Sequence, residues 1–254
     1  MMRLSKFLAL CGFGSRRKNK DLILQGKVWV NGTPIYDLSY KIDLEKDEVV
    51  VNGKKVKVPP KVYYLFYKPR GYLTSLYDPF HRKTIRTFIE KLPYRVFPVG
   101  RLDKDSEGLI LLTNDGDLAN LLLHPKYEIK RTYWVWVSPK LEERAIKKLL
   151  IEGIEIDGKR IKPLIFRLIK NQEKSYVYEI TVKEGIKREI RKIVKALSGE
   201  VCRLLRIAFG PLNLKNLKPG EIRPLTKGEI EALYKLFQLK NSKILDNTSS
   251  ELFT

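Results

Sequence analysis

The residues most able to do chemistry lie in one acidic stretch, VGRLDKDSEGLILLTNDGDL, which runs from Val99 to Leu118. Asp103 and Asp105 follow an arginine and precede a leucine-rich run that predicts a buried strand. A carboxylate beside a rigid strand can act as a general base or as a nucleophile. It can also simply begin a turn.

A metal site is the other chemistry that this spacing suggests. Asp103, Asp105, Glu107 and Gly108 are spaced like the start of an EF-hand calcium loop. The twelfth position should be a bidentate glutamate, however, and here it is Asn114. The approach YRVFPVG also holds a proline where a helix is needed, so we expect no metal.

A second stretch, EGIKREIRKIVKALSG at 184–199, predicts an amphipathic helix with basic sides. Its apolar positions are Ile186, Ile190, Ile193, Val194 and Leu197. Its basic positions are Lys187, Arg188, Arg191, Lys192 and Lys195. Such a helix can be an ordinary solvated face packed on a sheet. Alternatively, one arginine turns inward to pair with a carboxylate while others hold phosphates, since guanidinium suits both.

The third stretch, KRTYWVWV at 130–137, predicts a strand rich in aromatic residues. Alternation places Tyr133 and Val135 on one face and Trp134 and Trp136 on the other. Aromatic residues in strands usually belong to the core. An aromatic side chain next to basic residues can also stack on an unpaired base.

Other common catalytic motifs are absent from the sequence. It contains neither a GxGxxG nor a GxxxxGK[ST] phosphate loop, and no Cys/His cluster with zinc spacing. The only histidines are His81 and His124, and the cysteines Cys11 and Cys202 are isolated. We therefore expect no cofactor, and a reducing cytoplasm suits the cysteine usage.

The net charge of +21 predicts an anionic partner. Fifty Lys and Arg face 29 Asp and Glu, which creates a field that attracts polyanions. A lysine-rich solubilising surface would give the same total. Residues 1–20, however, carry six basic residues and no acid, and this clustering favours nucleic acid. No apolar run approaches the roughly 20 residues that span a bilayer.

The first 58 residues predict a small RNA-binding module. Leu4, Phe7, Leu8 and Cys11 mark a first helix that ends at Gly12. A second helix runs from a Ser15 cap to Gly26, and turns at Asn31-Gly32 and Asn52-Gly53 follow. KVPPK, residues 57–61, is a predicted linker.

Residues 62–237 predict a second, larger domain, and 238–254 a polar tail. VYYLFYKP, RTYWVWVSP and SYVYEITVKEG are predicted strands, LEERAIKKLLIEGI a predicted helix, and Asp115 and Asp117 turn residues before the helix DLANLLL. Because strands return without regular βα alternation, we predict an α+β fold with a mixed, largely antiparallel sheet.

Together these stretches resemble pseudouridine synthases of the RsuA/RluB type over nearly the whole chain. YKPRGYLTSLYDP resembles the family's KPxG segment, and GRLDKDSEGLILLTNDG its GRLDxxTxGLLLLTNDG signature with Ser106 in place of Thr. KRTYWV resembles the KxY segment, EGIKREIRKI aligns with EGRNRQIRRM, and RLLRIAFGPLNLKNLKPGEIRPLT resembles the closing segment. The first sixty residues resemble the S4 RNA-binding module.

The resemblance implies roles for three residues. It makes Asp103 the catalytic aspartate, Tyr133 the contact to the target base, and Arg191 the partner that pairs with Asp103. Ile186 and Glu189 depart from the family's Arg and Gln, which puts RNA contacts near 186–189 in doubt. The implied reaction isomerises a uridine of ribosomal RNA to pseudouridine without a cofactor.

The basic residues are expected to bind the RNA backbone. They are Arg3, Lys6, Arg16, Arg17, Lys18, Lys20, Lys68, Arg101, Lys187 and Arg188. The expected partner is ribosomal RNA, 23S rather than 16S, or a ribosomal subunit precursor, met by a cytoplasmic monomer with no membrane association. The alternative is a non-catalytic RNA-binding or ribosome-assembly protein with the same fold.

Overall fold

The computed structural model describes residues 1–80 and 82–237 of the 254-residue chain. His81 and the predicted tail 238–254 therefore lie outside the described residues. The chain divides into two compact units. The first joins Met1–Val62 to Ile89–Val96, and the second contains Tyr63–Phe88 and the chain from Phe97 onward. Ile89–Val96 thus belongs to the first unit although the sequence places it within the 62–237 range.

The two predicted helices of the first unit are confirmed. They are α1 (Leu4–Leu10) and α2 (Arg16–Leu24). Ser15 caps α2 by accepting a hydrogen bond from the Lys18 N–H at 3.3 Å. Gly12, with φ +94°, follows α1, where an L side chain would be strained. Both helices bury their apolar residues against the small sheets, as Leu4, Leu8 and Ile23 are fully buried.

Two small sheets complete the first unit. Its strands are β1 (Met2–Arg3), β2 (Val28–Val30), β3 (Thr33–Pro34), β4 (Lys41–Ile42), β5 (Val49–Val51) and β6 (Lys54–Val56). β1 pairs with β4, and the others pair in the order β3-β2-β5-β6. Both predicted turns are present: Asn31-Gly32 and Asn52-Gly53 have positive φ, as tight hairpin turns require.

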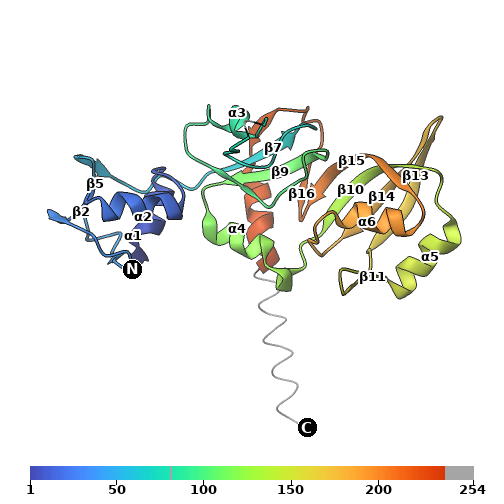
Figure 1. Ribbon diagram of the computed structural model, residues 1–254, viewed down its shortest axis with the longest axis horizontal. Helices are drawn as coiled ribbons and strands as arrows, with labels where there is room; N and C mark the ends of the chain where they lie inside the picture. The colour runs from blue at the N-terminus through green and yellow to red at the C-terminus, as the bar shows by residue number, and fades with distance from the viewer. Residues whose placement is uncertain (81, 238–254) are drawn as a thin grey trace, which may run out of the picture. The chain divides into compact units, whose positions relative to one another are not determined.

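The second unit is built on a nine-stranded sheet (Figure 1). Its main order is β13 (Ile165–Gln172), β14 (Ser175–Val182), β10 (Arg131–Ser138), β15 (Glu200–Phe209), β9 (Glu107–Thr113), β7 (Tyr63–Lys68) and β17 (Ile222–Pro224). β16 (Leu212–Asn213) pairs with β15, and β8 (Phe97–Val99) pairs with β9. Within the described residues, β9 and β15 form the one parallel pair of this sheet, so the predicted mixed, largely antiparallel α+β fold is confirmed.

Several helices pack against the large sheet. The helices and remaining strands of this part of the chain are α3 (Arg86–Ile89), α4 (Gly116–Leu123), η1 (Pro125–Tyr127), α5 (Glu143–Glu152), α6 (Glu189–Ala196), β11 (Ile154–Ile156), β12 (Lys159–Ile161) and the helical residues 227–237. α4 and the last helix pack with Leu109 and Leu111 of β9 in one buried cluster. α6 packs against β15 (Figure 1).

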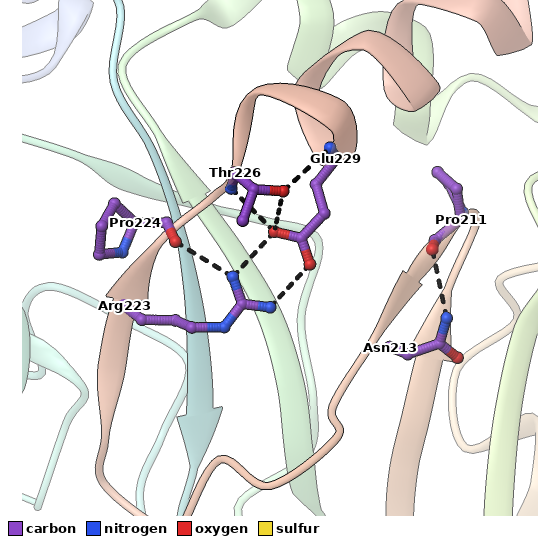
Figure 2. Close-up of polar contacts among 6 residues, drawn as sticks. All are labelled: Pro211, Asn213, Arg223, Pro224, Thr226 and Glu229. Carbon is purple, nitrogen blue, oxygen red and sulfur yellow. Dashed lines mark hydrogen bonds and ion pairs between the residues drawn. The ribbon is translucent and has the colours of Figure 1, made fainter.

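The last helix begins with a reciprocal cap, which Figure 2 shows. The Thr226 N–H donates to Glu229 Oε2 at 2.9 Å, and the Glu229 N–H donates to Thr226 Oγ1 at 3.3 Å. Arg223 donates to both carboxylate oxygens of Glu229, at 2.8 and 2.7 Å. This cap fixes the helix that carries Leu233 and Phe237 into the core.

Candidate active site

The predicted catalytic loop, residues 100–106, lies directly before β9 and is held by its backbone. Thr74 Oγ1 donates to the Leu102 carbonyl at 2.7 Å and accepts from the Leu102 N–H at 3.1 Å. The Gly71 N–H donates to the Lys104 carbonyl at 2.7 Å. Both loop aspartates, Asp103 and Asp105, are half-buried. These contacts hold the loop without using the Asp103 carboxylate.

Lys68 lies beneath this loop and has no exposed surface. Its ammonium donates to the Ser106 carbonyl at 2.6 Å and to the Pro69 carbonyl at 2.9 Å. Burial lowers the pKa of Lys68 to about 8, an effect that the nearby carboxylates oppose. The prediction that Lys68 binds RNA phosphate is therefore wrong, because a buried ammonium with two carbonyl partners cannot reach a phosphate.

Arg191 turns inward, as one of the two interpretations of the basic helix proposes, but its ion pair differs from the one expected. Its Nη2 lies 2.8 Å from Asp105 Oδ2, and its Nη1 donates to the Val201 carbonyl at 3.2 Å. Burial lowers the pKa of Arg191, whereas Asp105 and, more weakly, Asp103 raise it. The expected Arg191–Asp103 pair is thus replaced by an Arg191–Asp105 pair. Two aspartates, two residues apart, come within range of one guanidinium, and sequence spacing does not say which of them it takes.

Asp103 consequently keeps its carboxylate free. Within residues 1–80 and 82–237, no side chain donates a hydrogen bond to it and no cation forms an ion pair with it. Arg191 and Lys68 nevertheless lie close to it, because the negative charge of Asp103 raises the pKa of each of these two cations. A half-buried carboxylate in a positive field, with no protein partner, is ready for an external one.

Tyr133 belongs to the same face as this loop because a row of residues links them across four strands. Lys68 on β7 lies opposite Gly108 on β9, which lies opposite Arg206 on β15, which lies opposite Tyr133 on β10. A Cβ on Gly108 would stand 2.3 Å from the Arg206 carbonyl oxygen, so only glycine allows this approach. Tyr133 is 8 % exposed.

The helix that carries Arg191 is shorter than its sequence pattern predicts. α6 begins at Glu189 because Arg188 has a left-handed conformation, with φ 57°. Lys187 and Arg188 therefore lie in the preceding loop, exposed, and Arg188 Nη2 is 3.8 Å from Asp105 Oδ2. The two predicted RNA-binding residues thus stand at the edge of the site.

Glu189, one of the two departures from the family pattern, is buried rather than exposed to a ligand. Glu189 is only 6 % exposed. Burial raises its pKa to about 7, and the Glu184 carboxylate adds to that shift. The sequence alone gives no sign of this burial, because Glu189 stands in a run of charged residues.

Four of the six predicted RNA-binding residues of the first unit line one cavity. A cavity of about 370 Å³ is lined by Met1, Met2, Arg3, Ser5, Lys6, Arg16, Lys20 and Lys41. Arg17 and Lys18 are exposed on the same helix, α2. In the second unit, Arg101 is exposed on the predicted catalytic loop. Apart from Lys68, the predicted basic residues are all at least partly accessible.

Sequence reasoning assigned no role at the site to three residues that support or border it, Glu107, Arg70 and Arg206. Glu107 is buried, and it accepts from Arg203 Nε at 2.5 Å and from the Tyr67 hydroxyl at 3.0 Å. Arg70 is exposed and close enough to Arg191 to lower its pKa. Arg206 is buried on β15, between Gly108 of β9 and Tyr133 of β10. Its signal was available: an arginine inside the apolar run RLLRIAFG.

The structure gives no support to a calcium loop. Glu107, the third acidic residue of the spacing, points to Arg203 instead of joining Asp103 and Asp105. Across the described ranges, no group of three or more His, Cys, Asp or Glu side chains is placed to hold a metal ion. In the same ranges, no helix is long and apolar enough to cross a membrane.

Comparisons with known proteins match both units. The family model for RNA pseudouridylate synthase matches residues 62–196, and that for the S4 domain matches residues 2–49. The chain is 43% identical to an uncharacterised RNA pseudouridine synthase of Aquifex aeolicus, over 94% of this chain and 96% of that one. It is 40% identical to the ribosomal large subunit pseudouridine synthase B of Bacillus subtilis, over 92% and 96%. A crystal structure of a pseudouridylate synthase superimposes with a TM-score of 0.63 and 29% identity, over 92% of this chain and all of that one.

Proposed function

The chain belongs to the RNA pseudouridylate synthase family, and we propose that it isomerises a specific uridine of ribosomal RNA with Asp103 as the catalytic residue. One observation carries the proposal: the Asp103 carboxylate has no protein partner in the described residues, although two cations act on it. Asp105, Glu107 and Asp115 are all engaged by other side chains.

The reaction needs an ionised carboxylate at the sugar and nothing supplied from outside. The N1–C1′ bond breaks, the uracil turns, and a C5–C1′ bond forms; C5 loses a proton and N1 gains one, so the composition is unchanged. Asp103 acts either as a nucleophile at C1′ or as a base at C2′. Arg191 fixes the loop through Asp105 and places a positive charge near Asp103.

Tyr133 supplies the surface for the detached base. Its ring lies on the site face of β10, and a uridine must leave its helix to reach it. An aromatic ring offers any base a stacking partner worth about 1–3 kcal/mol. Tyr133 thus holds the uracil between bond cleavage and bond formation.

The RNA is held by basic residues of both units. The cavity at Arg3, Lys6, Arg16 and Lys20 offers a phosphate site in the S4 domain, and Arg101, Lys187 and Arg188 offer contacts at the catalytic loop. Such contacts position RNA without reading its sequence, and the affinity falls steeply with salt. The name of the Bacillus subtilis relative supports large-subunit RNA as the substrate. We further propose that the protein acts as a monomer in the cytoplasm.

Tritium release tests the proposal. Ribosomal RNA transcribed with uridine labelled at C5, both naked and assembled into subunit precursors, is incubated with wild type, Asp103→Ala and Asp117→Asn. We expect release by wild type and by the exposed control Asp117→Asn, none by Asp103→Ala, and equal RNA binding by all three. Release by Asp103→Ala would remove Asp103 from the mechanism. No release by any of them, with binding intact, would establish the RNA-binding alternative.

A further inference from the structure

Arg206 carries a buried charge that the fold does not neutralise. The residue is 3 % exposed, and its Nε donates to the Leu109 carbonyl at 2.7 Å. Its Nη2 is buried and has no hydrogen-bond partner within the described residues, and no carboxylate there pairs with the guanidinium. Burying a charge without an opposite charge is costly, and each unsatisfied donor adds to the cost. A purely structural residue at this position would be apolar.

The surroundings of Arg206 point to Tyr133. The two residues lie directly opposite each other in the β10–β15 pairing. Burial lowers the pKa of Arg206, and its interaction with Tyr133 opposes that shift. Two cations, Arg131 and Lys68, lie close enough to the guanidinium to repel it. Phe209 covers the guanidinium, whose Cζ lies 5.4 Å from the ring centre, and so keeps water out.

We propose that Arg206 is a positioning residue for Tyr133: its unused Nη2 N–H donates to the Tyr133 phenol oxygen in the RNA-bound enzyme and fixes the ring beneath the detached uracil. Hydrogen bonds at an active site often close only in the substrate complex, which explains the open donor here. Gly108 is part of the same device, because a side chain there would push the Arg206 backbone away. This inference rests on the stacking role proposed for Tyr133.

A double-mutant cycle tests it. Initial rates of tritium release are measured for wild type, Arg206→Met, Tyr133→Phe and the double variant, together with the RNA dissociation constants. If Arg206 acts through the hydroxyl, each single change lowers kcat by about 10- to 100-fold, as for loss of a hydrogen bond to a charged group. The double variant is then no slower than Tyr133→Phe, and RNA affinity does not change.

Arg203 provides the matched control. It lies on the same strand but pairs with Glu107 and stacks on Trp136. Losses from Arg203→Met and Tyr133→Phe should therefore multiply. If Arg206→Met does not fold, as judged by its unfolding transition, Arg206→Lys takes its place, because lysine keeps the charge but loses the planar geometry.

The possible results distinguish a failure of the inference about Arg206 from a failure of the proposed function. Multiplying losses from Arg206 and Tyr133, in an enzyme that still depends on Asp103, would overturn the role of Arg206 alone. Activity that survives Asp103→Ala would overturn the proposed function instead. A rise in KM with unchanged kcat would also overturn the inference, since it would mean that Arg206 shapes RNA binding rather than the position of Tyr133 during the reaction.

Discussion

An aspartate lies at each end of strand β9, and the two differ in whether other residues bind their carboxylates. Asp103 precedes the strand, half-buried, with two cations nearby and no partner for its carboxylate among the described residues. Asp115 follows the strand and is 2 % exposed. Its Oδ1 accepts from two N–H groups of α4, and its Oδ2 accepts from the hydroxyls of Tyr63 and Tyr234, each at 2.9 Å.

The difference shows how one strand serves two purposes. At the Asp115 end, every acceptor is filled by a donor from β7, α4 or the last helix, so the carboxylate ties three elements together. At the Asp103 end, backbone carbonyl groups and Asp105 make the contacts that hold the loop, and the Asp103 carboxylate has no partner among the described residues. A saturated aspartate stabilises the fold, whereas an unsaturated one on a rigid loop is available for chemistry.

The largest expected effect lies at the Asp103 end. Asp103→Asn keeps the shape of the side chain and removes its charge, so tritium release should fall on the order of 1000-fold or more. The free energy of unfolding in urea should change by less than about 0.5 kcal/mol, because the side chain has no partner to lose. A large loss of stability would mean that the two ends of β9 are alike after all.

At the Asp115 end of β9 we expect the opposite result, a loss of stability without a loss of activity. Asp115→Ala removes a helix cap and leaves two tyrosine hydroxyls without their acceptor, which should cost about 3 kcal/mol of unfolding free energy. Urea unfolding measures this, and kcat of the folded fraction should stay near that of wild type. If kcat collapses while stability holds, Asp115 belongs to the chemistry.

Asp105→Asn sharpens the contrast within the loop itself. It breaks the 2.8 Å pair with Arg191 and lets the guanidinium move. We expect tritium release to fall by about 10- to 100-fold, the size of effect that a small displacement of a catalytic group produces. A loss as large as that of Asp103→Asn would show that the two aspartates share the chemical role.

The smallest effect concerns the helix that brings Tyr234 to Asp115. Arg223 lowers the pKa of Glu229 to about 2, with help from the Thr226 N–H. The folded form therefore binds a proton less readily than the unfolded chain, so the stabilisation is complete above about pH 4.5 and disappears as the pH falls towards 2. Glu229→Gln should cost about 1 kcal/mol at pH 7, flatten the pH dependence of unfolding in that window, and leave kcat unchanged.

The local elements could be predicted from sequence because their signals are local. Ser15, Gly12 and the two Asn-Gly pairs act through neighbours in the chain, and all of them do what their positions predict. The start of α6 could not be predicted in the same way. Arg188 adopts a left-handed conformation that no local pattern in KREIRK indicates.

Contacts across the sheet could not be predicted from the sequence, for a different reason. Lys68 reads as a basic residue beside a turn, yet strand pairing buries it under a loop that lies more than thirty residues later. The choice of Asp105 over Asp103 by Arg191 likewise depends on how the loop and α6 meet. The family resemblance pointed to these segments, but the partner that each side chain takes is set by tertiary geometry.

The parallel pairing of β9 with β15 has a consequence for the order in which the enzyme is made. Arg206 comes 98 residues after its neighbour Gly108 (206 minus 108). At about 5–20 residues per second of synthesis, the first part of β9 waits roughly 5 to 20 seconds for that partner. During this time the growing chain already contains the loop with Asp103, but it does not yet contain Arg206 on β15. The isomerase therefore cannot act on RNA until the end of its own translation is near.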